Sequence, residues 1–157
     1  MNNELTIGPM TVTALSEYNL SVSLVDIRRD PVKYPRISAT KREDAIQKMA
    51  RIVYAAFLYR NQSTTKEVVS FTATALVDEI MADTHFGLQT LSWAEIGMVI
   101  RRAVLGGGKE LYGVSVSSLY SALVDYAKAE GNEACKKAWA VEINYHPQIE
   151  DLDNVPF

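Results

Sequence analysis

Apolar residues recur every three or four positions along residues 40–60, a spacing that places them on one face of a helix. The members of this stripe are Ala45, Ile46, Met49, Ile52, Val53, Ala56 and Phe57. Thr40 and Glu43 stand before it at the spacing of a capping box, in which each side chain satisfies a backbone N–H of the first turn. The pattern predicts a helix from Thr40 to about Arg60.

The same opening occurs twice more, at Thr64-Thr65-Lys66-Glu67 and at Ser92-Trp93-Ala94-Glu95. Apolar residues at helical spacing follow both, so we expect helices that end near Asp83 and Val104. A fourth apolar pattern begins at Ser115, which is expected to cap a helix that runs to about Lys128.

A glycine indicates where the fourth predicted helix ends. Gly131 is expected to close the fourth helix as a C-cap, because glycine adopts the left-handed conformation found there. A short last helix is then expected over Glu133–Trp139. The interpretation is an all-α, mainly helical bundle of four to five helices, with short connections that pack neighbours antiparallel.

Residues 1–39 lack this regularity. Leu20–Ile27 alternates imperfectly and is expected to be extended, and Asp30-Pro31 and Tyr34-Pro35 interrupt any helix. We therefore divide the chain into a partly extended N-terminal arm (1–39), a helical domain (40–140) and a flexible acidic tail (141–157), whose acidic residues are Glu142, Glu150, Asp151 and Asp153.

Composition narrows the class of protein. The chain has 157 residues, 48% hydrophobic residues and a net charge of −3, which is ordinary for one globular domain. No apolar run is long enough to span a membrane, and the start lacks the pattern of a secretory signal. Cys135 is the only cysteine, which favours a reducing compartment, and the expected location is cytoplasmic.

Cations gather in the arm, where they could contact nucleic acid: Arg28, Arg29, Lys33 and Arg36. The alternative is a solvated connector that Tyr34 and Ile37 pack onto the body. Because the body as a whole is close to neutral, strong nonspecific binding to phosphates is not expected.

Gly106-Gly107-Gly108-Lys109 is superficially similar to a phosphate-binding loop. That motif requires a glycine at the position of Ala103 and Ser or Thr at that of Glu110, and it follows a strand rather than a helix. We reject a nucleotide site and expect the glycines to end one helix and turn the chain.

Residues 112–120 look like the start of the recognition helix of helix-turn-helix proteins. Ser115 and Ser117 are small polar residues at a helix start, suited to phosphate or base contacts. The nearby cations are Arg101, Arg102 and Lys109. The alternative is a structural hairpin in which Ser115 is a cap and Leu119, Leu123 and Tyr126 are core residues, because the connection is longer than usual.

Catalytic chemistry has little support in the residue pattern. Asp78, Glu79, Asp83 and His85 could hold a metal, but a solvated helix end explains them better. With two histidines and one cysteine, no nucleophile with its base is recognisable. We expect a noncatalytic protein without metal or cofactor.

Residues 150–157, Glu-Asp-Leu-Asp-Asn-Val-Pro-Phe, resemble the terminal peptide of bacterial single-stranded-DNA-binding proteins. That resemblance implies a partner-binding role, in which the peptide recruits replication proteins that bind such tails. The role is carried over to Asp151, Asp153, Val155, Pro156 and Phe157. Leu152 and Asn154 depart from the family's acidic run, and the family's β-barrel body does not match the helices expected here.

Residues 53–60, Trp93-Ala94-Glu95-Ile96 and residues 112–126 resemble a small uncharacterised helical family of phages and mobile elements, similar to helicase loaders. The resemblance implies an accessory protein of DNA replication that engages DNA or a helicase-type partner. Two alternatives stay open: a helix-turn-helix-like DNA-binding regulator, and a helical interaction or structural protein without a nucleic-acid role. The oligomeric state is not indicated.

Overall fold

The computed structural model describes residues 15, 17–18, 21–106 and 113–144. Over these residues the chain is helical, and the only β pairing is an isolated bridge between Arg36 and Ser92, so the predicted all-α class is confirmed. The helices are α2 (Leu24–Arg29), α3 (Arg42–Tyr59), α4 (Lys66–Ala82), α5 (Trp93–Val104), α6 (Val116–Tyr126) and α7 (Asn132–Asn144). Three short turns join them: η1 (Ile37–Ala39), η2 (Leu88–Thr90) and the π-helical η3 (Ala127–Gly131).

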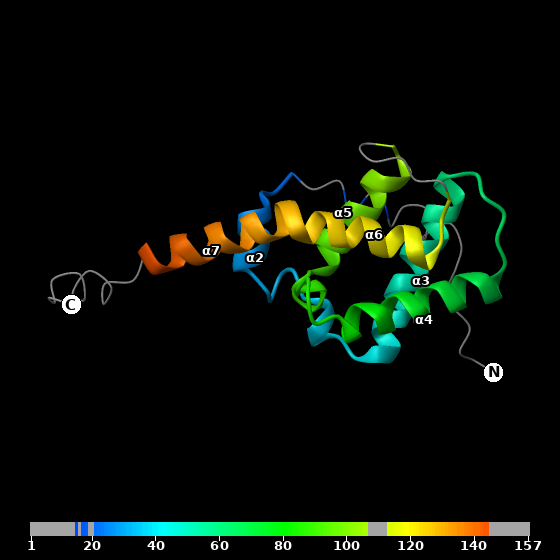
Figure 1. Cartoon of the computed structure of the whole chain (residues 1–157), viewed down its shortest axis with the longest axis horizontal. Helices are drawn as coiled ribbons and strands as arrows, with labels where there is room; N and C mark the ends of the chain where they lie inside the picture. The colour runs from blue at the N-terminus through cyan, green and yellow to red at the C-terminus, as the bar shows by residue number, and fades with distance from the viewer. Residues whose placement is uncertain (1–14, 16, 19–20, 107–112, 145–157) are drawn as a thin grey trace, which may run out of the picture.

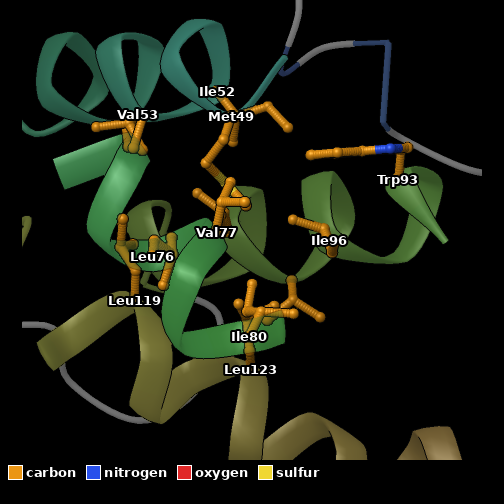
Figure 2. Close-up of a cluster of buried hydrophobic side chains, with 14 of the residues drawn as sticks. Met49, Ile52, Val53, Leu76, Val77, Ile80, Trp93, Ile96, Leu119 and Leu123 are labelled. Carbon is orange, nitrogen blue, oxygen red and sulfur yellow. The ribbon is translucent and has the colours of Figure 1, made fainter. Parts of the chain in front are cut away.

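Helices α3, α4, α5 and α6 enclose the hydrophobic core. The antiparallel pair α3 and α4 makes the most extensive contact, α6 packs on α4 and α5, and α5 also touches α3. Figure 2 shows the buried side chains that these four helices contribute, among them Met49, Ile52, Leu76, Val77, Ile80, Ile96, Leu119 and Leu123. The apolar spacing of the sequence therefore predicted which helix faces are buried.

Helices α6 and α7 form one uninterrupted rod, because η3 joins them without leaving the helical path. The rod starts in the core, and its α7 half extends away from the bundle with α2 beside it (Figure 1). The prediction that Gly131 ends a helix is wrong, and the last helix is longer than Glu133–Trp139. In the described residues the glycines with positive φ are Gly87 and Gly106. A glycine ends a helix only where the chain needs such a turn.

The three predicted capping boxes have different outcomes. The box of Ser92 and Glu95 is present in both directions at the start of α5. The box at Thr40 is wrong: Lys41 is the N-cap, with no side-chain bond, and the Thr40 hydroxyl accepts the indole N–H of Trp93 at 2.9 Å. The Thr40 hydroxyl therefore takes part in a tertiary hydrogen bond instead of the local capping box.

The other two helix starts are capped by hydroxyl groups. At α4 the cap is Thr65 rather than Thr64, and its Oγ1 accepts the N–H of Val68 at 3.2 Å. At α6 the predicted cap Ser115 is confirmed, with Ser118 as its reciprocal partner.

The arm contains a helix that the sequence did not predict. Residues 24–27, expected to be extended as part of Leu20–Ile27, belong to α2, whose N-cap Ser23 accepts the N–H of Asp26. The imperfect alternation is explained by one helical face, on which Ile27 is buried. Farther on, the arm has turns and one isolated bridge at Arg36, where Ile37 N–H donates to the Leu91 carbonyl at 2.9 Å and Trp93 N–H donates to the Pro35 carbonyl at 3.0 Å.

None of the helices in the described ranges combines the length and the apolar character that crossing a bilayer requires.

Candidate functional site

The buried carboxylate of Glu95 connects α5 to α2 and to α6. Glu95 is fully buried, and its Oε1 accepts the Arg28 Nε–H of α2 at 2.8 Å and the Tyr126 hydroxyl of α6 at 2.6 Å. Its Oε2 accepts the backbone N–H and the hydroxyl of Ser92, both at 3.0 Å. We call Arg28, Ser92, Glu95 and Tyr126 the Glu95 network.

Within the Glu95 network, the buried negative charge of Glu95 is paired with the positive charge of Arg28. The Arg28 side chain is 6% exposed and that of Glu95 0% exposed, so both ions have left water. A second guanidinium nitrogen of Arg28 lies 3.4 Å from the Thr90 hydroxyl. Burial raises the pKa of Tyr126, and the hydrogen bond to Glu95 and its charge raise it further. The phenol therefore stays a proton donor to the carboxylate at ordinary pH.

The π-helical turn η3 lies against this network. A Cβ atom at Gly131 would lie 3.3 Å from Arg28 Nη2 and 3.3 Å from the Tyr126 ring, which is a tight contact on both sides. The glycine thus makes room for the guanidinium next to the rod. Single π turns within α-helices are frequent at functional sites, which directs attention to the surface beside η3.

An open groove lies on that surface, between α2 on one side and η3 and α7 on the other. Its volume is about 710 Å³, within the range of about 300–1,000 Å³ that is usual for ligand pockets. We call it the α2–α7 groove, and it is lined by Leu24, Val25, Lys128, Ala129, Glu130, Asn132, Glu133, Ala134, Lys136 and Lys137.

The lining combines apolar and charged side chains. Leu24 and Val25 are half-buried, and Lys136 and Lys137 are exposed. Glu130 is engaged by Arg102, whose Nη1 lies 3.0 and 3.1 Å from its two oxygens. The groove is therefore suited to a ligand that has apolar groups and negative charge together.

The predicted nucleic-acid-binding residues of the arm do not share one role. Arg28 is committed to the buried pair with Glu95. Arg29 is exposed and lies 3.8 Å from Asp26, and the exposed Lys33 has its ammonium 5.6 Å from the Tyr34 ring centre. Arg36 is half-buried and bridges to Ser92 through its backbone. The packing of Ile37, which is fully buried, holds this segment on the body.

Some of the residues predicted to bind nucleic acid in the α5–α6 hairpin already have partners within the protein. Arg102 pairs with Glu130, whereas the half-buried Arg101 has an Nε that is buried without a hydrogen-bond partner. Ser115 and Ser117 are exposed at the start of α6, and the Ser115 hydroxyl caps that helix. Leu119, Leu123 and Tyr126 are buried, as the structural-hairpin alternative expected.

Several predicted residues lie outside the described part of the chain. These are Lys109 and the tail residues Asp151, Asp153, Val155, Pro156 and Phe157. Gly106, at the start of the glycine run, has a φ of 76°, which agrees with its predicted role in turning the chain after α5.

The acidic cluster at the end of α4 organises a loop. Asp83 is buried rather than solvated, and it accepts the backbone N–H groups of His85, Phe86 and Leu88 at 3.0–3.2 Å. Burial acts to raise its pKa, but these hydrogen bonds outweigh it and the pKa is lowered. Asp78 pairs instead with Arg42 at 2.9 Å. No cluster of potential metal ligands occurs among the described residues.

The Glu95 network and the α2–α7 groove were missed from the sequence. Glu95 and Ser92 were recognised as a cap, Tyr126 as core and Arg28 as a surface cation, so each residue was assigned separately. The available signal was a tyrosine hydroxyl on an apolar helix face, since a buried hydroxyl requires a partner. That signal does not name the partner.

No family model, no curated protein and no solved structure matches this chain.

Proposed function

We propose that this protein is a noncatalytic, cytoplasmic accessory factor of phage or mobile-element DNA replication, which binds a protein partner through residues 151–157. The observation that supports this proposal is the α6–α7 rod. It is anchored in the core and leads the chain out to Asn144, shortly before the acidic segment (Figure 1). A rigid helix of this kind carries the chain away from the core before that segment begins.

The chemistry of the segment fits a partner with an apolar pocket and a basic rim. Phe157 supplies an aromatic group, Pro156 restricts the backbone, and Asp151 and Asp153 can pair with Arg or Lys. Such pockets are those of replication proteins that bind the tails of single-stranded-DNA-binding proteins. The helical body would add contacts with DNA or a helicase-type partner.

The described body surface favours a protein partner over a phosphate backbone. Among the cations predicted to bind nucleic acid, Arg28 is buried in its pair with Glu95, and Arg102 is already paired with Glu130. Phosphate affinity increases with the number of cations that can replace counterions, and paired cations contribute less.

Binding of the full-length chain to replication proteins with such pockets tests the proposal. Phe157→Ala is expected to weaken capture by 30-fold or so, about the 2 kcal/mol of an aromatic hot spot. Ile149→Ala, immediately before the segment, is the matched control and is expected to bind as the unmodified chain does. Equal binding by Phe157→Ala and the unmodified chain would exclude this role for the segment.

A DNA-binding regulator is the second candidate, because Ser115 and Ser117 are exposed at the first turn of α6. It predicts that Ser117→Ala and Arg101→Ala reduce a duplex-DNA mobility shift. Glu79→Gln, an exposed change on α4, is the control. The unmodified chain must first give a salt-sensitive shift, and without one this candidate fails.

A further inference from the structure

We propose that the α2–α7 groove is an intramolecular docking site for the protein's own acidic segment, residues 150–157. The docking itself does not require the replication role. Its consequence, that the segment is held until a partner displaces it, rests on the proposed function.

Charge is the first argument. Three lysines line the groove, Lys128, Lys136 and Lys137, against two carboxylates. One of these carboxylates, Glu130, is already neutralised by Arg102 at 3.0 Å. The segment carries Glu150, Asp151 and Asp153 and no cation. The groove and the segment therefore have complementary charges.

Apolar surface is the second argument. Leu24 and Val25 of α2 face the groove without being fully buried, and Ala129 and Ala134 continue the apolar lining on the rod. The segment has Leu152 between its acidic residues, and Val155 and Phe157 after them. A peptide with this pattern can place apolar groups against α2 while its carboxylates meet the lysines of α7.

The length of chain available is the third argument. Lys136 lies eight residues before Asn144 on α7, which is about 12 Å along a helix. Glu150 lies six residues after Asn144, and six extended residues span up to about 20 Å. The segment can therefore turn back along α7 and reach the lysines without any change in the rod.

The test uses nuclear magnetic resonance of the full-length, ¹⁵N-labelled chain. The variant Glu150→Gln/Asp151→Asn/Asp153→Asn removes the negative charge of the segment. The reporters are the backbone amides of Leu24 and Val25, which lie in the groove but more than a hundred residues away in the sequence. We expect both resonances to move by more than a linewidth.

The matched control is Glu43→Gln/Glu67→Gln/Glu79→Gln, which neutralises three exposed carboxylates on α3 and α4. It is expected to leave both reporters in place. The reciprocal variant Lys136→Glu/Lys137→Glu is expected to release the segment and shift the reporters in the same direction as the segment variant. Reporters that stay unmoved in both groove and segment variants overturn the proposal.

Three further outcomes separate this proposal from its alternatives. Reporter shifts that change when the protein is diluted tenfold identify the segment of a second copy as the occupant, which overturns intramolecular docking. Retained partner capture with unmoved reporters rejects the docking alone. Shifted reporters with capture insensitive to Phe157→Ala support the docking and reject the proposed replication role.

Discussion

The α3–α6 core and the Glu95 network stabilise the same molecule by different physical means. The core consists of interlocking apolar side chains, such as Leu76 and Ile96, that need only shape and volume. The Glu95 network holds α2 and the rod to α5 through hydrogen bonds and one buried ion pair. The core should therefore tolerate changes that keep its volume, whereas the network should not tolerate loss of one partner.

The difference also concerns sequence distance. The core brings together helices whose apolar stripes are visible one at a time. The network joins Arg28 to Glu95 and Glu95 to Tyr126, separations of 67 and 31 residues, through single polar atoms. One substitution can therefore disconnect the elements that form the α2–α7 groove while the core stays intact.

The largest expected effect is that of Glu95→Ala. It leaves the Arg28 guanidinium buried without its partner, and such a loss typically costs about 3–5 kcal/mol of unfolding free energy. Urea unfolding measures the total, and hydrogen exchange is expected to show the greatest loss of protection in α2 and α7. Glu130→Ala breaks the exposed pair with Arg102 and is the control, at about 0–1 kcal/mol. A similar cost for both variants would contradict the assigned burial.

Leu76→Ala comes next and tests the core. Removing this fully buried side chain is expected to cost about 2–5 kcal/mol, with protection lost across α3, α4 and α6 alike. Leu76→Met keeps most of the volume and should cost less than about 1.5 kcal/mol. If Leu76→Ala destabilised only α2 and α7, the distinction between the two regions would be wrong.

Tyr126→Phe isolates one bond of the network. The ring still packs, but Glu95 loses the hydroxyl that donates at 2.6 Å, and a hydrogen bond to a charged group is worth about 1.5–3 kcal/mol. Thermal or urea unfolding gives the cost. Tyr54→Phe changes a half-buried tyrosine on α3 and serves as the comparison, with an effect within about 0.5 kcal/mol.

The smallest effect is expected for Asp83→Asn, and it depends on pH. The folded pKa of Asp83 is lowered by its backbone hydrogen bonds, although burial opposes them. Its contribution to stability is therefore present above the unfolded pKa, about 3.9, and is lost as pH falls through the folded value. Asp83→Asn should make the loss of stability below about pH 4 shallower. Asp44→Asn, at an exposed position, is the control. An identical decrease of stability at acid pH in both variants would contradict the assignment of this effect to Asp83.

The sequence predicted the core well because its signals are local. The spacing of Met49, Ile52 and their neighbours, and the box of Ser92 and Glu95, require no knowledge of other helices. The hydrogen bonds of Thr40 show the limit of such signals. Its hydroxyl is used by Trp93, which is 53 residues away, instead of by the helix that it precedes.

Gly131 illustrates the same limit at the candidate site. A glycine between two helical patterns indicates a C-cap, yet here it lies within a continuous rod and makes room for the Arg28 side chain. Both uses require a residue without a side chain, so the residue type alone does not distinguish them. The α2–α7 groove depends on this choice, and for that reason it could not be predicted.

The sequence by itself determined the helical class, the four apolar faces that form the core and the acidic, Pro-Phe character of residues 150–157. Those properties follow from the order and spacing of side chains. Only the tertiary structure decided that Arg28, Glu95 and Tyr126 meet, that α6 and α7 are one rod, and that a groove with three lysines lies beside α2. Burial of a single carboxylate requires partners from distant elements, and only the folded chain brings them together.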